Sequence, residues 1–188
     1  MSVKDLVSQT EVKMKKALES VTREFSEVRT GRAHPGLFEG MHADYYGTPT
    51  MIKQMASITV PDAKTITIQP WDVTAIVEIE KAISNSNLGL SPTNDGKLIR
   101  ISIPPLSKER REELAKVIKD MAENGRISLR TIRREANEKI KKMQSDKLIS
   151  EDDSFKAQEQ VQKITDRYIK DIDKIVESKH KELTEVQH

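Results

Sequence analysis

A row of basic side chains between residues 111 and 141 offers the clearest chemistry in this sequence. Between residues 126 and 142, seven bases stand against two acids. Such self-repulsion is relieved by a polyanion, and arginine matches the geometry of phosphate, so the row predicts binding of RNA or another polyanion. The alternative is a solvated helix face with intrahelical pairs such as Arg130 with Glu135. The row contains Arg111, Lys119, Arg126, Arg130, Arg133 and Lys141 at multiples of the helical turn, interrupted by Ala115, Ala122 and Asn137 and widened by Arg134 and Lys142.

Aromatic side chains are scarce around this row. Their scarcity argues against stacking on bases and favours recognition of structured RNA through its backbone and shape. Tyr45 and Tyr46 form the one adjacent aromatic pair in the chain. Because neighbouring strand residues point to opposite faces, we expect one of these two rings to lie in the core.

No arrangement of residues predicts catalysis or metal binding. The four histidines are far apart, and Glu177 with His180 is one histidine and carboxylate pair at helical spacing, whereas a di-metal site needs a second such pair and further carboxylates. Asp95-Gly96-Lys97 lacks the rest of a phosphate-binding loop. The acids at 151–153 lack the alternating spacing of a calcium loop. We therefore expect no enzyme activity, no metal and no cofactor.

The composition of the chain indicates the broad class of protein. The chain has 188 residues, a net charge of +2 and no cysteine, which excludes disulfides and thiolate chemistry and is typical of a reducing compartment. No apolar run is long enough for a membrane span or a signal peptide. We expect a soluble cytoplasmic protein of one or two domains.

Proline and glycine divide the chain into helical ends and an irregular middle. All seven prolines lie between Pro35 and Pro105, and outside residues 31–96 the only glycine is Gly125. Apolar stripes at helical spacing predict helices near residues 1–30, 106–145 and 150–188, and three such stripes imply a three-helix bundle. Gly125 lies in the second stripe, where it indicates either close approach of another helix or a kink. The last stripe is Phe155, Val161, Ile164, Tyr168, Ile172, Ile175, Leu183 and Val186.

The middle segment has the pattern of a small domain that mixes strands and a helix. Residues 56–60, 65–69 and 98–103 alternate or are rich in β-branched side chains, which predicts strands, and residues 73–83 fit a short helix. We therefore expect an α+β protein with a bundle from residues 1–30 and 105–188 and an inserted α/β domain at 31–104. The two connections, Thr30-Gly31-Arg32 and Pro104-Pro105, predict a two-stranded hinge.

Six sequence blocks together resemble the bacterial ribosome recycling factors. They follow the order of that family over nearly the whole chain. Against the family pattern, His34 and Ser91 replace the more usual serine and asparagine. The blocks are Val28-Arg29-Thr30-Gly31-Arg32-Ala33-His34-Pro35, Tyr45-Tyr46-Gly47-Thr48-Pro49, Asn87-Leu88-Gly89-Leu90-Ser91-Pro92, Pro104-Pro105-Leu106 with Glu109-Arg110-Arg111-Glu112-Glu113-Leu114, Arg130-Thr131-Ile132-Arg133-Arg134-Glu135-Ala136-Asn137 and Ile149-Ser150-Glu151-Asp152-Asp153.

This resemblance implies a non-enzymatic translation factor with an L shape like that of transfer RNA. Such a factor binds the large ribosomal subunit and its 23S rRNA across the transfer RNA sites. With elongation factor G and GTP it splits the complex after termination, releasing messenger RNA and transfer RNA. Carried over by position, Arg110, Arg111, Arg130, Arg133 and Arg134 would face ribosomal RNA, with Lys119, Arg126 and Lys141 from the same row.

Two other classes of protein remain open from the residues alone. A coiled-coil scaffold would dimerise through an exposed apolar seam, whereas we expect a monomer that binds neither DNA nor membrane. An RNA-dependent enzyme would need a pocket with convergent polar groups and turnover by the isolated protein.

Overall fold

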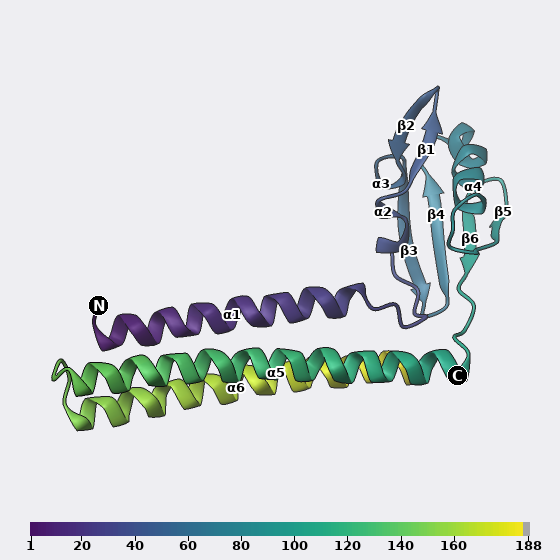
Figure 1. Cartoon of the computed structure of the whole chain (residues 1–188). Helices are drawn as coiled ribbons and strands as arrows, with labels where there is room; N and C mark the ends of the chain where they lie inside the picture. Colours follow the sequence, from purple (N-terminus) through teal and green to yellow (C-terminus); the bar gives the residue numbers. More distant parts are fainter. Residues whose placement is uncertain (186–188) are drawn as a thin grey trace. The chain divides into compact units, whose positions relative to one another are not determined.

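The protein, described here by a computed structural model over residues 1–185, contains two compact units (Figure 1). The helical unit comprises residues 1–30 and 108–182, and the inserted unit comprises residues 31–107 together with 183–185. The predicted division differs from this one at residues 105–107 and 183–185. Val186, which the sequence places in the last apolar stripe, and His188 lie outside the described residues.

Three long helices form the helical unit: α1 (Val3–Glu27), α5 (Lys108–Ser145) and α6 (Glu151–Glu185). Helix α5 runs without interruption for 38 residues, which at 1.5 Å per residue is about 57 Å. The buried side chains follow the predicted stripes closely and include Met14, Phe25, Ile118, Leu129, Val161 and Ile172. The α+β class and the three helices predicted from the sequence are confirmed.

Gly125 is a point of close approach between helices. A Cβ atom built on this residue would lie 2.7 Å from Val21 Cγ2 of α1 and 3.1 Å from Ile172 Cδ1 of α6. Any larger side chain would clash, because both neighbours are themselves buried. The close approach predicted as one reading of this glycine is confirmed, and α5 continues through it without a break.

The turn between α5 and α6 is built by local hydrogen bonds. Lys147 has φ +58°. Its backbone N–H donates to the Gln144 carbonyl at 2.9 Å, and that of Leu148 donates to the Met143 carbonyl at 2.9 Å. This is the pattern of a Schellman cap, with lysine where glycine is usual. Ser150 then caps α6, since its hydroxyl accepts from the Asp153 N–H at 3.0 Å.

One predicted core residue is on the surface. The Phe155 residue is 68% exposed, while Ser154 and Ala157 of the same helical turn are buried. Ala157 packs with Leu6, Ala136 and Ile140. Because small residues let the helices approach closely at this end, the buried face of α6 is rotated away from Phe155.

The inserted unit contains two antiparallel sheets and short helices. Strands β1 (His42–Tyr45) and β2 (Thr48–Met51) form a hairpin, and the second sheet has the order β3-β4-β6-β5. Its strands are β3 (Ala56–Asp62), β4 (Thr65–Pro70), β5 (Pro92–Asn94) and β6 (Ile99–Ser102), and the helical segments are α2 (Gly36–Glu39), α3 (Ile52–Met55), η1 (Val73–Ala75) and α4 (Ile76–Ser84).

Alternation along the strands sets the core of this unit. Ile66 and Ile68 of β4 and Ile99 and Ile101 of β6 are fully buried and pack with Ile79 of α4. Neighbouring residues such as Arg100 are exposed, as in a sheet that is solvated on one face. Three strands and the helix at 73–84 agree with the sequence prediction, whereas β1, β2 and β5 were not predicted.

Both connecting segments are fastened to one turn of the inserted unit. The Ala33 N–H donates to the Ala63 carbonyl at 2.8 Å, and the Ile103 N–H donates to the Lys64 carbonyl at 2.7 Å. Ala63 and Lys64 form the turn between β3 and β4. The inserted unit is therefore entered and left at adjacent points, as the sequence predicted for an insertion.

Candidate nucleic-acid interface

The basic row lies on α5, along the side where α5 meets α6. Arg126 donates to Asp173 of α6, and Arg133 donates to the Gln162 side-chain oxygen of α6 at 3.2 Å. Arg111, Arg126 and Arg133 are only partly exposed. By helical spacing the row lies one residue, about 100°, around from the apolar stripe, which predicts an exposed position beside the buried seam. Arg126 and Arg133 instead reach across that seam to α6, since the helices are packed closely enough for long side chains to do so.

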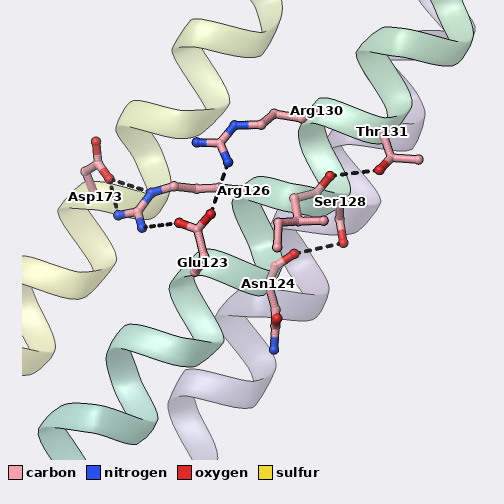
Figure 2. A network of polar contacts seen from close by, with 8 residues as sticks. Glu123, Asn124, Arg126, Ser128, Arg130, Thr131 and Asp173 are labelled. Atoms are coloured by element: carbon pink, nitrogen blue, oxygen red, sulfur yellow. Dashed lines mark hydrogen bonds and ion pairs between the residues drawn. The ribbon is translucent and has the colours of Figure 1, made fainter.

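Arg126 is committed to an ion pair within the bundle (Figure 2). Its Nε and Nη2 donate to Asp173 Oδ1 at 3.2 and 2.6 Å, and its Nη1 lies 3.4 Å from Glu123 Oε2. The hydrogen bond with Asp173 raises the pKa of Arg126, with a smaller contribution from Glu123. An arginine held by two carboxylates joins α5 to α6, and it is not free for a ligand.

Glu123 also partners Arg130. The Arg130 Nη1 donates to Glu123 Oε1 at 3.0 Å, and both side chains are about half exposed (Figure 2). Residues 126–142 contain few acids, but Glu123 lies one helical turn earlier. Ion pairs this exposed contribute roughly 0–1 kcal/mol. A phosphate therefore competes for Arg130 at small cost.

Two polar atoms along the row are buried without a hydrogen-bond partner among residues 1–185. They are Arg111 Nε and Asn137 Oδ1. Such atoms are rare in folded proteins, and ordered water is their usual partner. Arg111 belongs to the row, and Asn137 is one of the residues that interrupt it. Their burial shows that parts of this side of α5 are covered by the protein itself.

Among the residues of the row and the two that widen it, the exposed cations are Lys119, Arg130, Arg134, Lys141 and Lys142. Lys119, Arg134 and Lys141 have no ion pair within residues 1–185, and Arg133 bonds only a neutral amide. Arg110, in the first turn of α5, pairs with Glu113 at 2.8 Å. We call Arg130, Arg133, Arg134 and Lys141 the α5 flank. It is the part of the row that best fits a polyanion.

The predicted hinge residues differ in how firmly they are held. Thr30 is buried, and its hydroxyl donates to Glu182 Oε2 of α6 at 3.0 Å. Gly31 has φ +77°, and a Cβ there would lie 2.9 Å from Leu106 Cγ of the other connecting segment. Arg32, Pro104 and Pro105 are exposed. Thr30 therefore belongs to the helical unit, and the segment without such an anchor begins at Gly31.

Tyr45 and Tyr46 do not point to opposite faces. Both hydroxyls donate to Asp72 Oδ2, at 2.9 and 3.3 Å. Tyr45 is partly buried and Tyr46 is exposed. Tyr45 packs against the core of the inserted unit, as expected for one of the two rings. Tyr46 does not take the opposite strand face because it has left the strand and begins the β1–β2 turn with φ +51°.

Among residues 1–185, no three histidine, cysteine or acidic side chains are grouped as metal ligands. Within the same residues, no helix combines the length and hydrophobicity needed to cross a membrane.

Comparisons with known proteins place this chain among translation factors. Residues 21–184 match the family model described as "Ribosome recycling factor". The chain is 52% identical to the ribosome-recycling factor of Oleidesulfovibrio alaskensis, covering 96% of this chain and 98% of that protein. It is 50% identical to that of Syntrophomonas wolfei, covering 98% and 100%. The chain belongs to the ribosome recycling factor family.

Solved structures agree with this assignment. A solution structure of the ribosome recycling factor superposes with a TM-score of 0.73 at 41% identity, covering 98% of both chains. A second match has a TM-score of 0.65 at 42% identity, covering 97% of this chain and 99% of the other. It is the T. thermophilus ribosome recycling factor, which is described with E. coli elongation factor G bound to the E. coli post-termination complex.

Proposed function

We propose that this protein recycles ribosomes after termination in the cytoplasm, acting as a monomer without catalytic activity of its own. Family membership over residues 21–184 carries the proposal. The related T. thermophilus factor is described with elongation factor G on a post-termination complex, which supports the ribosome and elongation factor G as partners. GTP hydrolysis by that partner supplies the energy for separating the subunits and releasing messenger RNA and transfer RNA.

The α5 flank is the proposed contact to 23S rRNA of the large subunit. Arg134 and Lys141 are exposed without ion-pair partners in residues 1–185, and Arg133 is bonded only to the amide of Gln162. Arginine and lysine without internal counter-ions bind phosphates and release condensed cations from RNA. Lys119, Arg110 and Arg111 extend the same surface toward the start of α5. Arg126 contributes by holding α5 against α6.

The proposed mechanism is that of a lever. The bundle grips RNA through a continuous helix, and the inserted unit is tethered through Gly31 and Arg32 on one side and Pro104 and Pro105 on the other. A stiff helix transmits displacement without unwinding. We propose that the connecting segments allow the inserted unit to change orientation when elongation factor G acts on the bound factor.

Binding to purified large subunits at several salt concentrations tests the RNA contact. Arg133→Ala should weaken binding by about tenfold, which is on the order of 1 kcal/mol or more, and lower the salt slope by about one. Arg23→Ala, an exposed arginine of α1, is the matched control and should change neither. An unchanged salt slope for Arg133→Ala would reject the α5 flank as the contact.

Recycling itself is tested by polysome breakdown. Addition of this protein with elongation factor G and GTP should convert polysomes to monosomes and subunits, and omission of any one component should prevent it. Breakdown that is equally fast without this protein would reject the function. Sedimentation of the isolated protein distinguishes the proposed monomer from a coiled-coil dimer.

A further inference from the structure

Tyr46 adopts a backbone conformation that its own side chain disfavours. Tyr46 and Gly47 have φ values of +51° and +82°, and they join the paired residues Tyr45 and Thr48. A two-residue turn with positive φ at both positions is a type I′ hairpin turn, in which asparagine or glycine is usual at the first position. A bulky side chain is strained there, and strain of this kind concentrates at functional sites. Folding of the hairpin alone does not explain this tyrosine.

The exposed ring of Tyr46 is nevertheless held in place. Tyr46 is 77% exposed, yet its hydroxyl donates to Asp72 Oδ2 at 3.3 Å and lies 3.2 Å from the Thr74 hydroxyl. Its ring also makes an edge contact with Tyr45, with centroids 4.7 Å apart. A side chain that is already ordered loses little entropy when a partner covers it. Tyr46 is therefore organised for contact before any partner arrives.

Further exposed apolar side chains follow on the segment that Tyr46 contacts. Trp71 and Val73 flank Asp72, and Val77 lies one helical turn after Thr74. Trp71, Val73 and Val77 are 69%, 55% and 49% exposed. Tyrosine and tryptophan are the residues most enriched at the energetic centres of protein interfaces. We call Tyr46, Trp71, Val73 and Val77 the Tyr46 corner.

The charge of this corner selects the kind of partner. Residues 42–55 and 65–84, which build it, contain the four acids Asp44, Asp72, Glu78 and Glu80 against Lys53 and Lys81, a net charge of −2, and Lys81 pairs with Glu78. Aromatic platforms that stack on nucleic-acid bases are combined with a positively charged groove. An acidic surround instead complements a basic protein surface.

We propose that the Tyr46 corner is a docking surface for a protein that presents an apolar pocket rimmed by lysine and arginine. The contact is separate from the α5 flank and lies wholly on the inserted unit. Because its test uses ribosome complexes, it rests on the proposed function. The occupancy of those complexes is therefore measured independently.

Photo-crosslinking from Val77 tests the docking surface while leaving Tyr46 intact. The full chain carrying p-benzoylphenylalanine at position 77 is bound to post-termination ribosomes with elongation factor G and a non-hydrolysable GTP analogue. Co-sedimentation first measures binding. Irradiation should then give an adduct with one protein, at a peptide that contains lysine or arginine. An adduct with RNA alone, an adduct at an acidic peptide, or no adduct from a chain that co-sediments would each overturn the proposal.

A second substitution links the adduct to Tyr46. Tyr46→Asn suits the turn, and in the same chain it should lower the adduct yield at least tenfold without changing co-sedimentation. Thr93→Asn, at an exposed position of β5, is the control and should change the yield less than twofold. Equal yields from both variants would overturn the proposal. Loss of co-sedimentation by the natural chain as well would count against the proposed function, whereas its loss by the crosslinking chain alone would contradict a docking surface that is separate from the α5 flank.

Discussion

Gly125 of α5 faces Val21 of α1 so closely that a methyl group on the glycine would lie 2.7 Å from Val21 Cγ2. Gly125→Ala should therefore destabilise the bundle by about 1–2 kcal/mol, since overpacking costs roughly 1–3 kcal/mol and exceeds the gain of about 1 kcal/mol in helix propensity. Urea unfolding followed by circular dichroism measures the change. Val21→Ala in the same chain should make the alanine at 125 less costly by about 1 kcal/mol or more. Additive effects of the two substitutions would contradict the close contact.

Lys147 is a position where replacement should stabilise the protein. Its φ of +58° costs a residue with a side chain about 1 kcal/mol relative to glycine, which adopts this conformation freely. Lys147→Gly should raise the free energy of unfolding by about 1 kcal/mol. Lys142→Gly, inside the last turn of α5, should lower it by a similar amount. The two urea midpoints should thus move in opposite directions, and a shared direction would contradict the cap geometry.

Glu123 restrains the α5 flank electrostatically. Removing its charge frees Arg130 from the 3.0 Å ion pair and lessens repulsion of RNA phosphates. Glu123→Gln should therefore tighten large-subunit binding by about two- to fivefold at low salt, a gain expected from an exposed ion pair and one that high salt should abolish. Glu159→Gln on α6, which removes the partner of Lys163, is the matched change of charge. Weaker binding by Glu123→Gln would show that its carboxylate supports the contact.

Asp72 links stability of the inserted unit to pH. Its carboxylate accepts from the Thr74 hydroxyl at 2.6 Å, from the Thr74 N–H at 3.0 Å and from both tyrosines. These bonds, first of all that from the Thr74 hydroxyl, lower the pKa of Asp72 below its ordinary value. A carboxylate with a depressed folded-state pKa stabilises the fold above the unfolded pKa of about 3.9, and this contribution is lost as the pH falls through the folded-state value.

Asp72→Asn should consequently lower the thermal midpoint of the inserted unit at pH 7, and the difference from the natural chain should shrink as the pH falls below about 4. Asp44→Asn, at an exposed residue of β1, serves as the control for loss of a carboxylate in the same unit. A difference that is constant with pH would contradict the role of the Asp72 charge.

Substitution of Gly31 should lower the stability of the protein for two separable reasons. Gly31→Ala introduces strain at φ +77° and a contact of 2.9 Å with Leu106 Cγ. Adding Leu106→Ala removes the contact and leaves the strain, so it should recover part of the lost stability, with about 1–2 kcal/mol remaining.

The proposed lever also predicts that shortening Pro104-Pro105 leaves large-subunit binding intact and slows subunit splitting. Normal splitting by that variant would reject the hinge.

Sequence periodicity was sufficient for the long elements and insufficient for the short ones. Apolar stripes placed α5 within a few residues because a 38-residue helix repeats its pattern many times. Strands β1 and β5 have four and three residues, too few for alternation to be recognised. Phe155 was misplaced because the buried face of α6 depends on how closely small residues allow α1 and α5 to approach.

The candidate interface was predicted as a row, but the sequence could not divide that row by role. Asp173 lies 47 residues after Arg126. Its contact with Arg126 depends on the register of α6 against α5, which the sequence pattern does not give. Likewise, helical spacing alone does not distinguish Arg134, which is exposed, from Arg111, which buries Nε. Both distinctions depend on tertiary packing.

The two backbone bonds to Ala63 and Lys64 bear on the order in which the chain folds during synthesis. Residues 31–107 separate α1 from its packing partner α5, and bringing the ends of so long a loop together is entropically unfavourable. Once the intervening residues have folded, these bonds hold Ala33 and Ile103 at adjacent points. Most of the entropic cost of bringing α1 and α5 together has then already been met. We therefore expect α1 to remain unpaired on the nascent chain until the insert has formed, and to dock rapidly once α5 emerges.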